Sequence, residues 1–166
     1  IWNVNVPYLR AVEDKEEQSP YQSWAVSVTV DNLSKSIKNS YSDIGTIKEI
    51  DFSGLKKNPN KASKSQVVKF IGSNKKSVEL TKTQLRSLLG LKSSNFTIEL
   101  EGNKKAKGDT LKIDKDDKKL IFKGSGFGHR LGMSQWGAKS LADKGKKYQQ
   151  ILYHYYNDVN IKDMYK

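Results

Sequence analysis

Alternating apolar and polar residues predict a series of short strands along most of the chain. In residues 22–30 the side chains of Trp24, Val26, Val28 and Val30 fall on one face, which is the pattern of a half-buried strand. Similar runs predict strands at 44–53, 65–72, 77–80, 96–101 and 120–124, with a short strand around Leu111 and Ile113. The polar SNKK stretch at 73–76 lies between the strands predicted at 65–72 and 77–80, and it predicts a hairpin.

Helical spacing predicts two short helices within this part of the chain. Asp31 is expected to cap the first of them, because an aspartate oxygen can accept from the free N–H groups of a first helical turn. The second runs from Thr81 to Gly90. Thr81 and Gln84 have the spacing of a capping box, and Gly90 suits the left-handed residue that ends a helix.

A pair of helices is predicted at the C-terminal end. The first follows Ser134, and its expected buried side consists of Met133, Trp136, Leu141 and Ala142, with Gly145 ending it. The second has apolar residues at helical spacing, namely Tyr148, Ile151, Leu152, Tyr155 and Tyr156. Strands and helices without regular βαβ alternation indicate an α+β fold in one domain. We expect a mixed sheet, several short helices and this C-terminal pair after a glycine-rich loop.

The segment before the helix pair, GSGFGHRLGMSQWG at 124–137, concentrates glycine around His129. Such clusters occur where backbone approaches another group closely or adopts positive φ. A phosphate or nucleotide loop is disfavoured, because the Walker lysine and the dinucleotide spacing are missing. A metal site is also disfavoured, since His154 is 25 residues away and cysteine is absent.

Two interpretations of the glycine-rich segment stay open on chemistry alone. It can shape a groove in which His129, Ser134 and Gln135 hydrogen-bond a neutral polar ligand such as a sugar. Alternatively, the glycines only allow tight packing and His129 is a buried histidine of the core.

Charge limits the partners that the chain suits. It carries 30 Lys and Arg against 18 Asp and Glu, a net charge of +12, which favours anionic partners. Arginine occurs only at positions 10, 86 and 130. Since base and phosphate recognition depend strongly on arginine, nucleic acid is disfavoured. The chain has no cysteine to form disulfides and no apolar run of the roughly 18 residues that cross a membrane.

The C-terminal segment resembles the signature of the stage II sporulation protein D (SpoIID/LytB) family, which runs approximately GxGxGHGxGMSQxGAxxMAxxGxxYxxILxxYY. The positions that match are Gly126, Gly128, His129, Gly132, Met133, Ser134, Gln135, Gly137, Ala138, Ala142, Gly145, Tyr148, Ile151, Leu152, Tyr155 and Tyr156. The N-terminal segment is similar to the middle of the same domain at Trp2, Pro7, Tyr8, Leu9, Ser19, Pro20, Tyr21 and Trp24. Arg130 departs from the pattern, where glycine is frequent, and would narrow a groove and add positive charge.

The resemblance implies a role at the bacterial cell wall. Family members include lytic transglycosylases that cleave peptidoglycan glycan strands stripped of stem peptides during sporulation, and others enhance a wall amidase. The cleavage needs a glutamic acid that protonates the glycosidic oxygen. In the family this acid lies upstream, in a V-x-x-E-M-P-like segment that this sequence lacks. We therefore expect residues 1–166 to be the C-terminal portion of one family domain, from a longer or processed protein, with no catalytic residue of its own. The acidic run Glu13, Asp14, Glu16 and Glu17 is expected to face solvent, and we assign it no acid role.

The resemblance also implies the residues of a glycan-binding wall. These are His129, Ser134 and Gln135, with Tyr8 and one of Tyr155 and Tyr156 beside them, because tyrosine rings stack on sugars. At helical spacing, Tyr148 and at least one of Tyr155 and Tyr156 are expected in the core. No metal or cofactor is expected. The implied partners are peptidoglycan glycan strands and other cell-wall hydrolases. The implied location is extracytoplasmic, with membrane anchoring only through a segment outside this chain.

Overall fold

The computed structural model describes residues 6–14, 19–56, 67–102, 106–129, 131–162 and 164. These residues divide into two compact units. We call residues 23–129 the sheet unit, and residues 2–22 together with 130–166 the terminal unit. Each is described by itself. Trp2, Glu16, Glu17 and Arg130, which the sequence singled out, lie outside the described residues.

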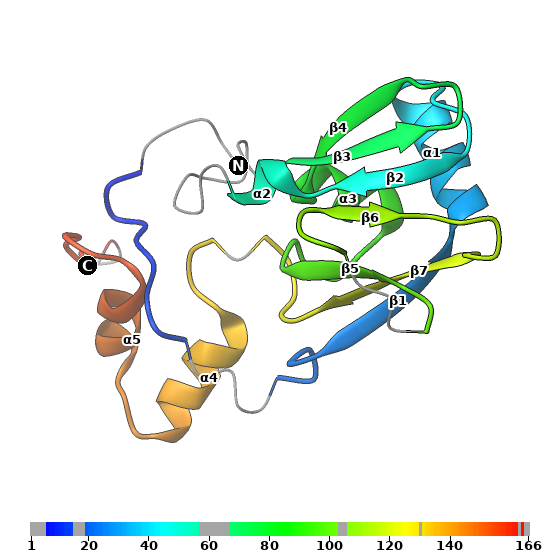
Figure 1. Ribbon diagram of the computed structural model, residues 1–166. Coiled ribbons are helices and arrows are strands. Elements are labelled where there is room, and N and C mark those ends of the chain that lie inside the picture. The colour runs from blue at the N-terminus through cyan, green and yellow to red at the C-terminus, as the bar shows by residue number, and fades with distance from the viewer. Residues whose placement is uncertain are drawn as a thin grey trace. The chain divides into compact units, whose positions relative to one another are not determined.

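The first sheet of the sheet unit has three strands, β1 (Trp24–Thr29), β7 (Lys119–Gly124) and β5 (Phe96–Leu100). β7 lies in the middle and pairs antiparallel with both neighbours (Figure 1). Leu120 and Phe122 of β7 are fully buried and alternate with more exposed residues, as the sequence pattern predicted. The middle strand of this sheet therefore carries the chain directly into the glycine-rich segment.

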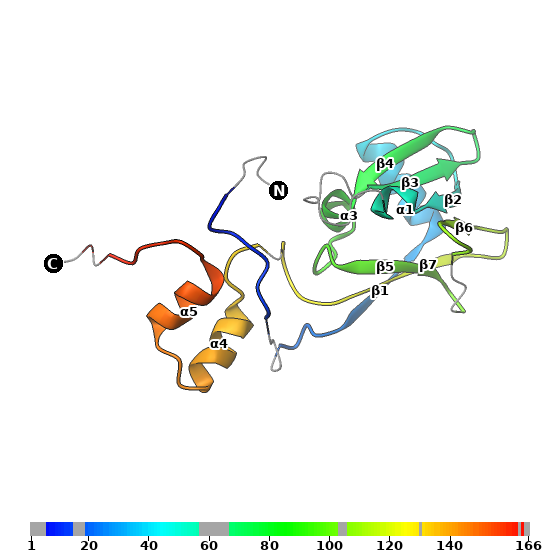
Figure 2. The same cartoon turned by 60° about the vertical axis from the view of Figure 1, so that its left-hand side comes forward.

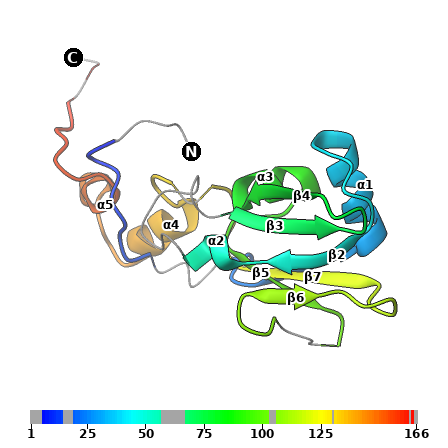
Figure 3. The ribbon, with the colours of Figure 1, turned by 45° about the horizontal axis from the view of Figure 1, so that its top comes forward.

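The second sheet has four strands in the order β4 (Ser77–Thr81), β3 (Val67–Gly72), β2 (Ile47–Asp51) and β6 (Thr110–Lys112) (Figure 3). The predicted hairpin joins β3 to β4, and Lys75 in its turn has a φ of 64°. All pairings between these strands are antiparallel, as they are in the first sheet. The α+β class is confirmed, but the expectation of a mixed sheet is wrong: hairpins and long antiparallel returns connect the strands that the structure describes.

The helices among the described residues of the sheet unit are α1 (Val30–Ser40), α2 (Ser53–Lys56) and α3 (Lys82–Leu89). The capping box of α3 and its left-handed stop at Gly90 are confirmed. The predicted cap of α1 is wrong, because Thr29 rather than Asp31 accepts the hydrogen bond, from the Asn32 N–H at 3.1 Å. The helix thus starts at Val30, directly after β1, and Asp31 supplies negative charge to its first turn.

One hydrophobic core holds the sheet unit together. α1 contacts α3 and one strand of each sheet, β1 and β2 (Figure 2). Its residues Leu33 and Ile37 are fully buried, as are Phe70 on β3 and Leu85 on α3. Because both sheets and two helices share this core, the strand that leads into the glycine-rich segment has a fixed support.

The terminal unit contains α4 (Gln135–Asp143) and α5 (Tyr148–Tyr155), which contact each other. The predicted helix pair is confirmed. On α5, Ile151 and Tyr155 are buried as expected, but Tyr148 is 64% exposed. The expected buried side of α4 is wrong, because Met133 is 40% exposed and Ala142 is exposed as well, whereas Trp136 and Leu141 are half-buried. The buried residues of α4 are Gly137 and Ser140. Small residues on α4 let a second segment approach closely, which large residues would prevent.

None of the helices within the described residues is long and apolar enough to cross a membrane.

The start of α3 provides a test of the sheet unit. Thr81→Val removes the hydroxyl that accepts from the Gln84 N–H at 3.1 Å, and we expect it to lower the free energy of unfolding by about 1 kcal/mol. Thr83→Val is the matched control, because the Thr83 hydroxyl is buried without a hydrogen-bond partner. Its removal should leave stability unchanged or raise it. Urea denaturation followed by NMR signals of β3 and β4 measures both, and equal losses would contradict the assignment.

Candidate functional site

The glycine-rich segment begins where β7 ends, against a buried tryptophan. A Cβ atom on Gly124 would overlap the Trp24 ring and the carbonyl oxygen of Asn95. The Trp24 indole N–H donates to the carbonyl of Gly126 at 3.1 Å. Gly126 itself has a φ of 76°, which other residues rarely adopt. The strand exit is therefore held by packing and a hydrogen bond at positions where glycine is required.

His129 follows this fixed turn. The N–H of Gly128 donates to the carbonyl of Lys92 at 2.7 Å, and Gly128 forms an isolated bridge with Ser93. The His129 side chain is exposed, so its interpretation as a buried core histidine is wrong. Phe127, two residues earlier, is 60% exposed. The segment thus presents an imidazole and an aromatic ring at the surface of the sheet unit.

The terminal unit brings two of the predicted tyrosines together. The ring centroids of Tyr8 and Tyr156 lie 6.3 Å apart. The Tyr156 hydroxyl accepts from the N–H of Met133 at 3.4 Å, and it lies beside Gly132, whose φ is 79°. The Tyr8 carbonyl accepts from the N–H of Asn157 at 3.1 Å. We refer to Tyr8, Tyr156 and the Gly132–Met133 backbone as the tyrosine platform.

Ser134 and Gln135 stand at the start of α4. The Ser134 hydroxyl oxygen accepts from the Gly137 N–H at 3.1 Å, so this side chain caps the helix. Gln135 is the first helical residue and its side chain is exposed. A ligand that reaches this point would therefore meet the Gln135 amide, with Ser134 fixing the direction of the helix.

Tyr155 differs from Tyr156, because it is buried, with 2% of its surface exposed. Its hydroxyl donates to the Asp14 carboxylate at 2.9 Å, and the neighbouring His154 ring nitrogen lies 2.8 Å from the Glu13 carbonyl. These contacts join α5 to residues 11–14 at the other end of the chain. They form part of the packing of the terminal unit, and no surface of Tyr155 is left for a ligand to stack on.

Gly137 lies at the centre of this packing. A Cβ atom there would overlap both the Asp14 carboxylate and the Tyr155 hydroxyl. Glu13 and Asp14 are exposed, as expected of an acidic run, but sequence reasoning missed the contact of the Asp14 carboxylate with Tyr155 and Gly137. One signal was present: a glycine inside a helix costs about 1 kcal/mol relative to alanine, so Gly137 called for a structural reason.

The predicted site residues therefore fall into separate groups. His129 belongs to the sheet unit, and the others belong to the terminal unit: Tyr8, Ser134, Gln135, Tyr155 and Tyr156. Within the terminal unit, Tyr8 and Tyr156 share the platform, and Ser134 and Gln135 follow it directly in the chain. Among the described residues, no three His, Cys, Asp or Glu side chains are grouped so that they could hold a metal ion.

Comparison with known proteins gives relatives over almost the whole chain. No protein-family model matches the sequence. An uncharacterized protein of Brachyspira hyodysenteriae is 31% identical over 166 residues, covering 98% of this chain and 39% of that protein. The amidase enhancer of Bacillus subtilis is 26% identical over 200 residues, covering 94% of this chain and 26% of that protein. Stage II sporulation protein D of Bacillus amyloliquefaciens is 28% identical over 163 residues, covering 98% of this chain and 40% of that protein. The chain thus spans between a quarter and two fifths of the length of these relatives.

Substitution of Gly137 by alanine tests this packing, because we expect it to change stability in the opposite direction from most Gly→Ala substitutions in helices. In most helices Gly→Ala stabilises by about 1 kcal/mol. Here we expect Gly137→Ala to lower the free energy of unfolding of the terminal unit, because the methyl group would separate Tyr155 from Asp14 and break the hydrogen bond between the hydroxyl and the carboxylate, which contributes about 1.5–3 kcal/mol. Urea denaturation followed by NMR signals of α4 and α5 measures the change.

The matched control introduces the same methyl group after both obstructing groups are removed. In a chain that already carries Asp14→Ala and Tyr155→Phe, Gly137→Ala should stabilise, because only the helix propensity is left. Stabilisation by Gly137→Ala in the unaltered chain would show that the close approach does not constrain this position.

Proposed function

We propose that this chain, which belongs to the family of stage II sporulation protein D and the amidase enhancer, helps to bind the glycan strands of peptidoglycan. One name refers to the enhancement of an amidase and the other to sporulation, and the family resemblance implies a role at the cell wall. The observation that carries the proposal is the tyrosine platform: two tyrosines from opposite ends of the chain, 6.3 Å apart, beside a backbone turn with exposed apolar residues.

The chemistry of the platform suits a sugar chain. A tyrosine ring offers an apolar face to the C–H groups of a sugar ring, and its hydroxyl can hydrogen-bond a sugar hydroxyl. Tyr8 is 45% exposed and Tyr156 is partly exposed, so both rings can be reached from solvent. The exposed Gln135 amide, just along the chain, adds a donor and an acceptor of the kind that a neutral polar ligand requires.

His129 is assigned to the same function from the sheet unit. Its imidazole is exposed after a turn that Trp24 and Gly126 hold in place, so the ring is displayed by a rigid element. The imidazole can both donate to and accept from sugar hydroxyls. In this proposal Ser134 acts by fixing the start of α4, and Tyr155 acts by holding Asp14, and neither stacks on the glycan.

In the whole protein, we propose that this binding serves cleavage of glycan strands without stem peptides, the activity of a lytic transglycosylase. The general acid of that reaction belongs to a segment outside these 166 residues, as the family pattern implies. The net charge of +12 suits work among the anionic polymers of a cell wall. The extracytoplasmic location that we propose rests on the family resemblance.

A second candidate function follows from the relative that is named an amidase enhancer. In that case the chain binds wall glycan without cleaving it and raises the activity of a wall amidase. A V-x-x-E segment upstream in the parent protein would favour the transglycosylase, and its absence would favour the enhancer.

The tyrosine platform gives the first test of binding. Tyr8→Ala should weaken binding to glycan strands without stem peptides about fivefold or more, since a stacking contact contributes about 1 kcal/mol. Tyr148→Ala is the matched control, because Tyr148 is an exposed tyrosine of the same unit, on α5. It should leave affinity within about twofold. Fluorescence or calorimetric titration measures both, and equal effects of the two variants would remove the platform from the binding site.

The assignment of the acid gives a separate test. The isolated 166-residue chain should release no anhydro-sugar fragments from glycan strands without stem peptides, because no general acid is assigned to it. Mass spectrometry of the soluble products after long incubation measures this. Product release that Glu13→Gln abolishes would place an acid within this chain and would overturn the assignment.

A further inference from the structure

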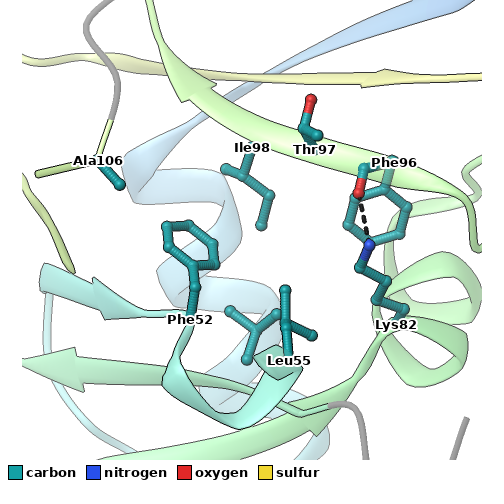
Figure 4. A pocket seen from close by; sticks show the side chains of 8 residues that line it. Phe52, Leu55, Lys82, Phe96, Thr97, Ile98 and Ala106 are labelled. Atoms are coloured by element: carbon teal, nitrogen blue, oxygen red, sulfur yellow. Dashed lines mark hydrogen bonds between the residues drawn. The ribbon is translucent and has the colours of Figure 1, made fainter. Parts of the chain in front are cut away.

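The sheet unit contains a pocket of about 200 Å³ that the proposed function does not use. Figure 4 shows its walls, with Phe52 and Leu55 pointing toward Ile98 of β5 and the Lys82 ammonium at one end. Thr97 points away and donates to the carbonyl of Lys123 at 3.4 Å. The described residues that line it are Phe52, Leu55, Val68, Lys82, Phe96, Thr97, Ile98 and Ala106.

The walls are apolar and firmly supported. Val68, Phe96 and Ile98 are buried members of the core, whereas Phe52 and Leu55 are half-buried and pack against it. Such a surface favours the transfer of an apolar group out of water. A cavity of about 150 Å³ with comparable walls can hold benzene, so this pocket has room for about six carbon atoms.

Lys82 is the charged residue among the described residues that line the pocket. Its ammonium donates to the Phe96 carbonyl at 2.8 Å and lies 5.3 Å from the centre of the Phe96 ring. Burial lowers the pKa of Lys82 from its ordinary value, because the charged form loses solvation. No carboxylate among the described residues pairs with it. An ammonium has three donors, and a partly buried one is stabilised most by an anion.

We propose that this pocket binds a small carboxylate that carries an unbranched apolar chain of about six carbons. The chain lies against Phe52, Leu55 and Ile98, and the carboxylate accepts a hydrogen bond from the Lys82 ammonium. The anion restores the stabilisation that the ammonium loses on burial. A neutral or cationic molecule of the same shape lacks this interaction, so the site selects by charge as well as by size.

The experiment compares three probes of equal chain length: hexanoate, 1-hexanol and hexylammonium. Each is titrated into the 166-residue chain while amide NMR signals are recorded. Hexanoate should shift signals of Leu55, Val68 and Ile98 saturably, with a dissociation constant of about 1 mM or below. Hexanol should bind about tenfold more weakly, a difference of about 1.4 kcal/mol, since its neutral hydroxyl makes a weaker hydrogen bond to the ammonium than a carboxylate does. Hexylammonium should not bind.

Variants of Lys82 separate the contribution of its charge to the affinity from the contribution of the apolar walls. Lys82→Met keeps the apolar stem and should weaken hexanoate about tenfold, to the level of hexanol. Lys82→Arg keeps a cation and should retain most of the affinity. Lys112→Met, on β6, removes an exposed lysine of the same unit and should leave the affinity for hexanoate unchanged. No saturable hexanoate shift in the unaltered chain, or undiminished affinity in Lys82→Met with a native-like spectrum, would overturn the proposal.

Discussion

At both ends of the segment between β7 and α4, the backbone lies so close to other groups that only glycine fits. At Gly124 the obstructing groups are the Trp24 ring and the Asn95 carbonyl, and at Gly137 they are Tyr155 and Asp14. Each contact fixes the backbone beside it within its own unit. The polar and aromatic groups assigned to glycan binding, from His129 to Gln135, therefore extend from two rigid supports, one in each unit.

Long-range contacts have the same effect within the terminal unit. The hydrogen bond between Tyr155 and Asp14 joins residues 141 positions apart, and the Tyr8–Tyr156 pair joins the same two ends of the chain. The adjacent tyrosines at the end of α5 therefore make different contacts. Tyr155 hydrogen-bonds the N-terminal segment at Asp14, and Tyr156, the residue after the helix, packs beside Tyr8 nearer the surface. A surface built in this way depends on both ends of the chain being present and correctly packed. Substitution of Asp14 should consequently alter the packing of Tyr8.

Local patterns allowed much of the fold to be predicted, and long-range packing explains the rest. Alternation located the strands, and the Thr81–Gln84 spacing located α3, because both signals act over a few neighbouring residues. The cap of α1 was predicted at the wrong residue because Thr29 is both the last residue of β1 and the N-cap of α1. The buried face of α4 was missed because the small residues Gly137 and Ser140 form it, whereas the prediction looked for large apolar side chains. For the site, the family pattern indicated Tyr8 and Tyr156, but no periodicity could show that they meet.

The central claim is that recognition of wall glycan depends on neutral stacking and hydrogen bonds in addition to the positive surface. A titration of the purified chain with glycan strands without stem peptides, repeated from low to high salt, separates the two. Salt at about 1 M shortens the screening length to roughly 3 Å, so contacts between exposed charges are lost and neutral contacts persist. We expect saturable binding that survives high salt. Binding that disappears with salt would assign the interaction to the +12 charge alone and contradict the account.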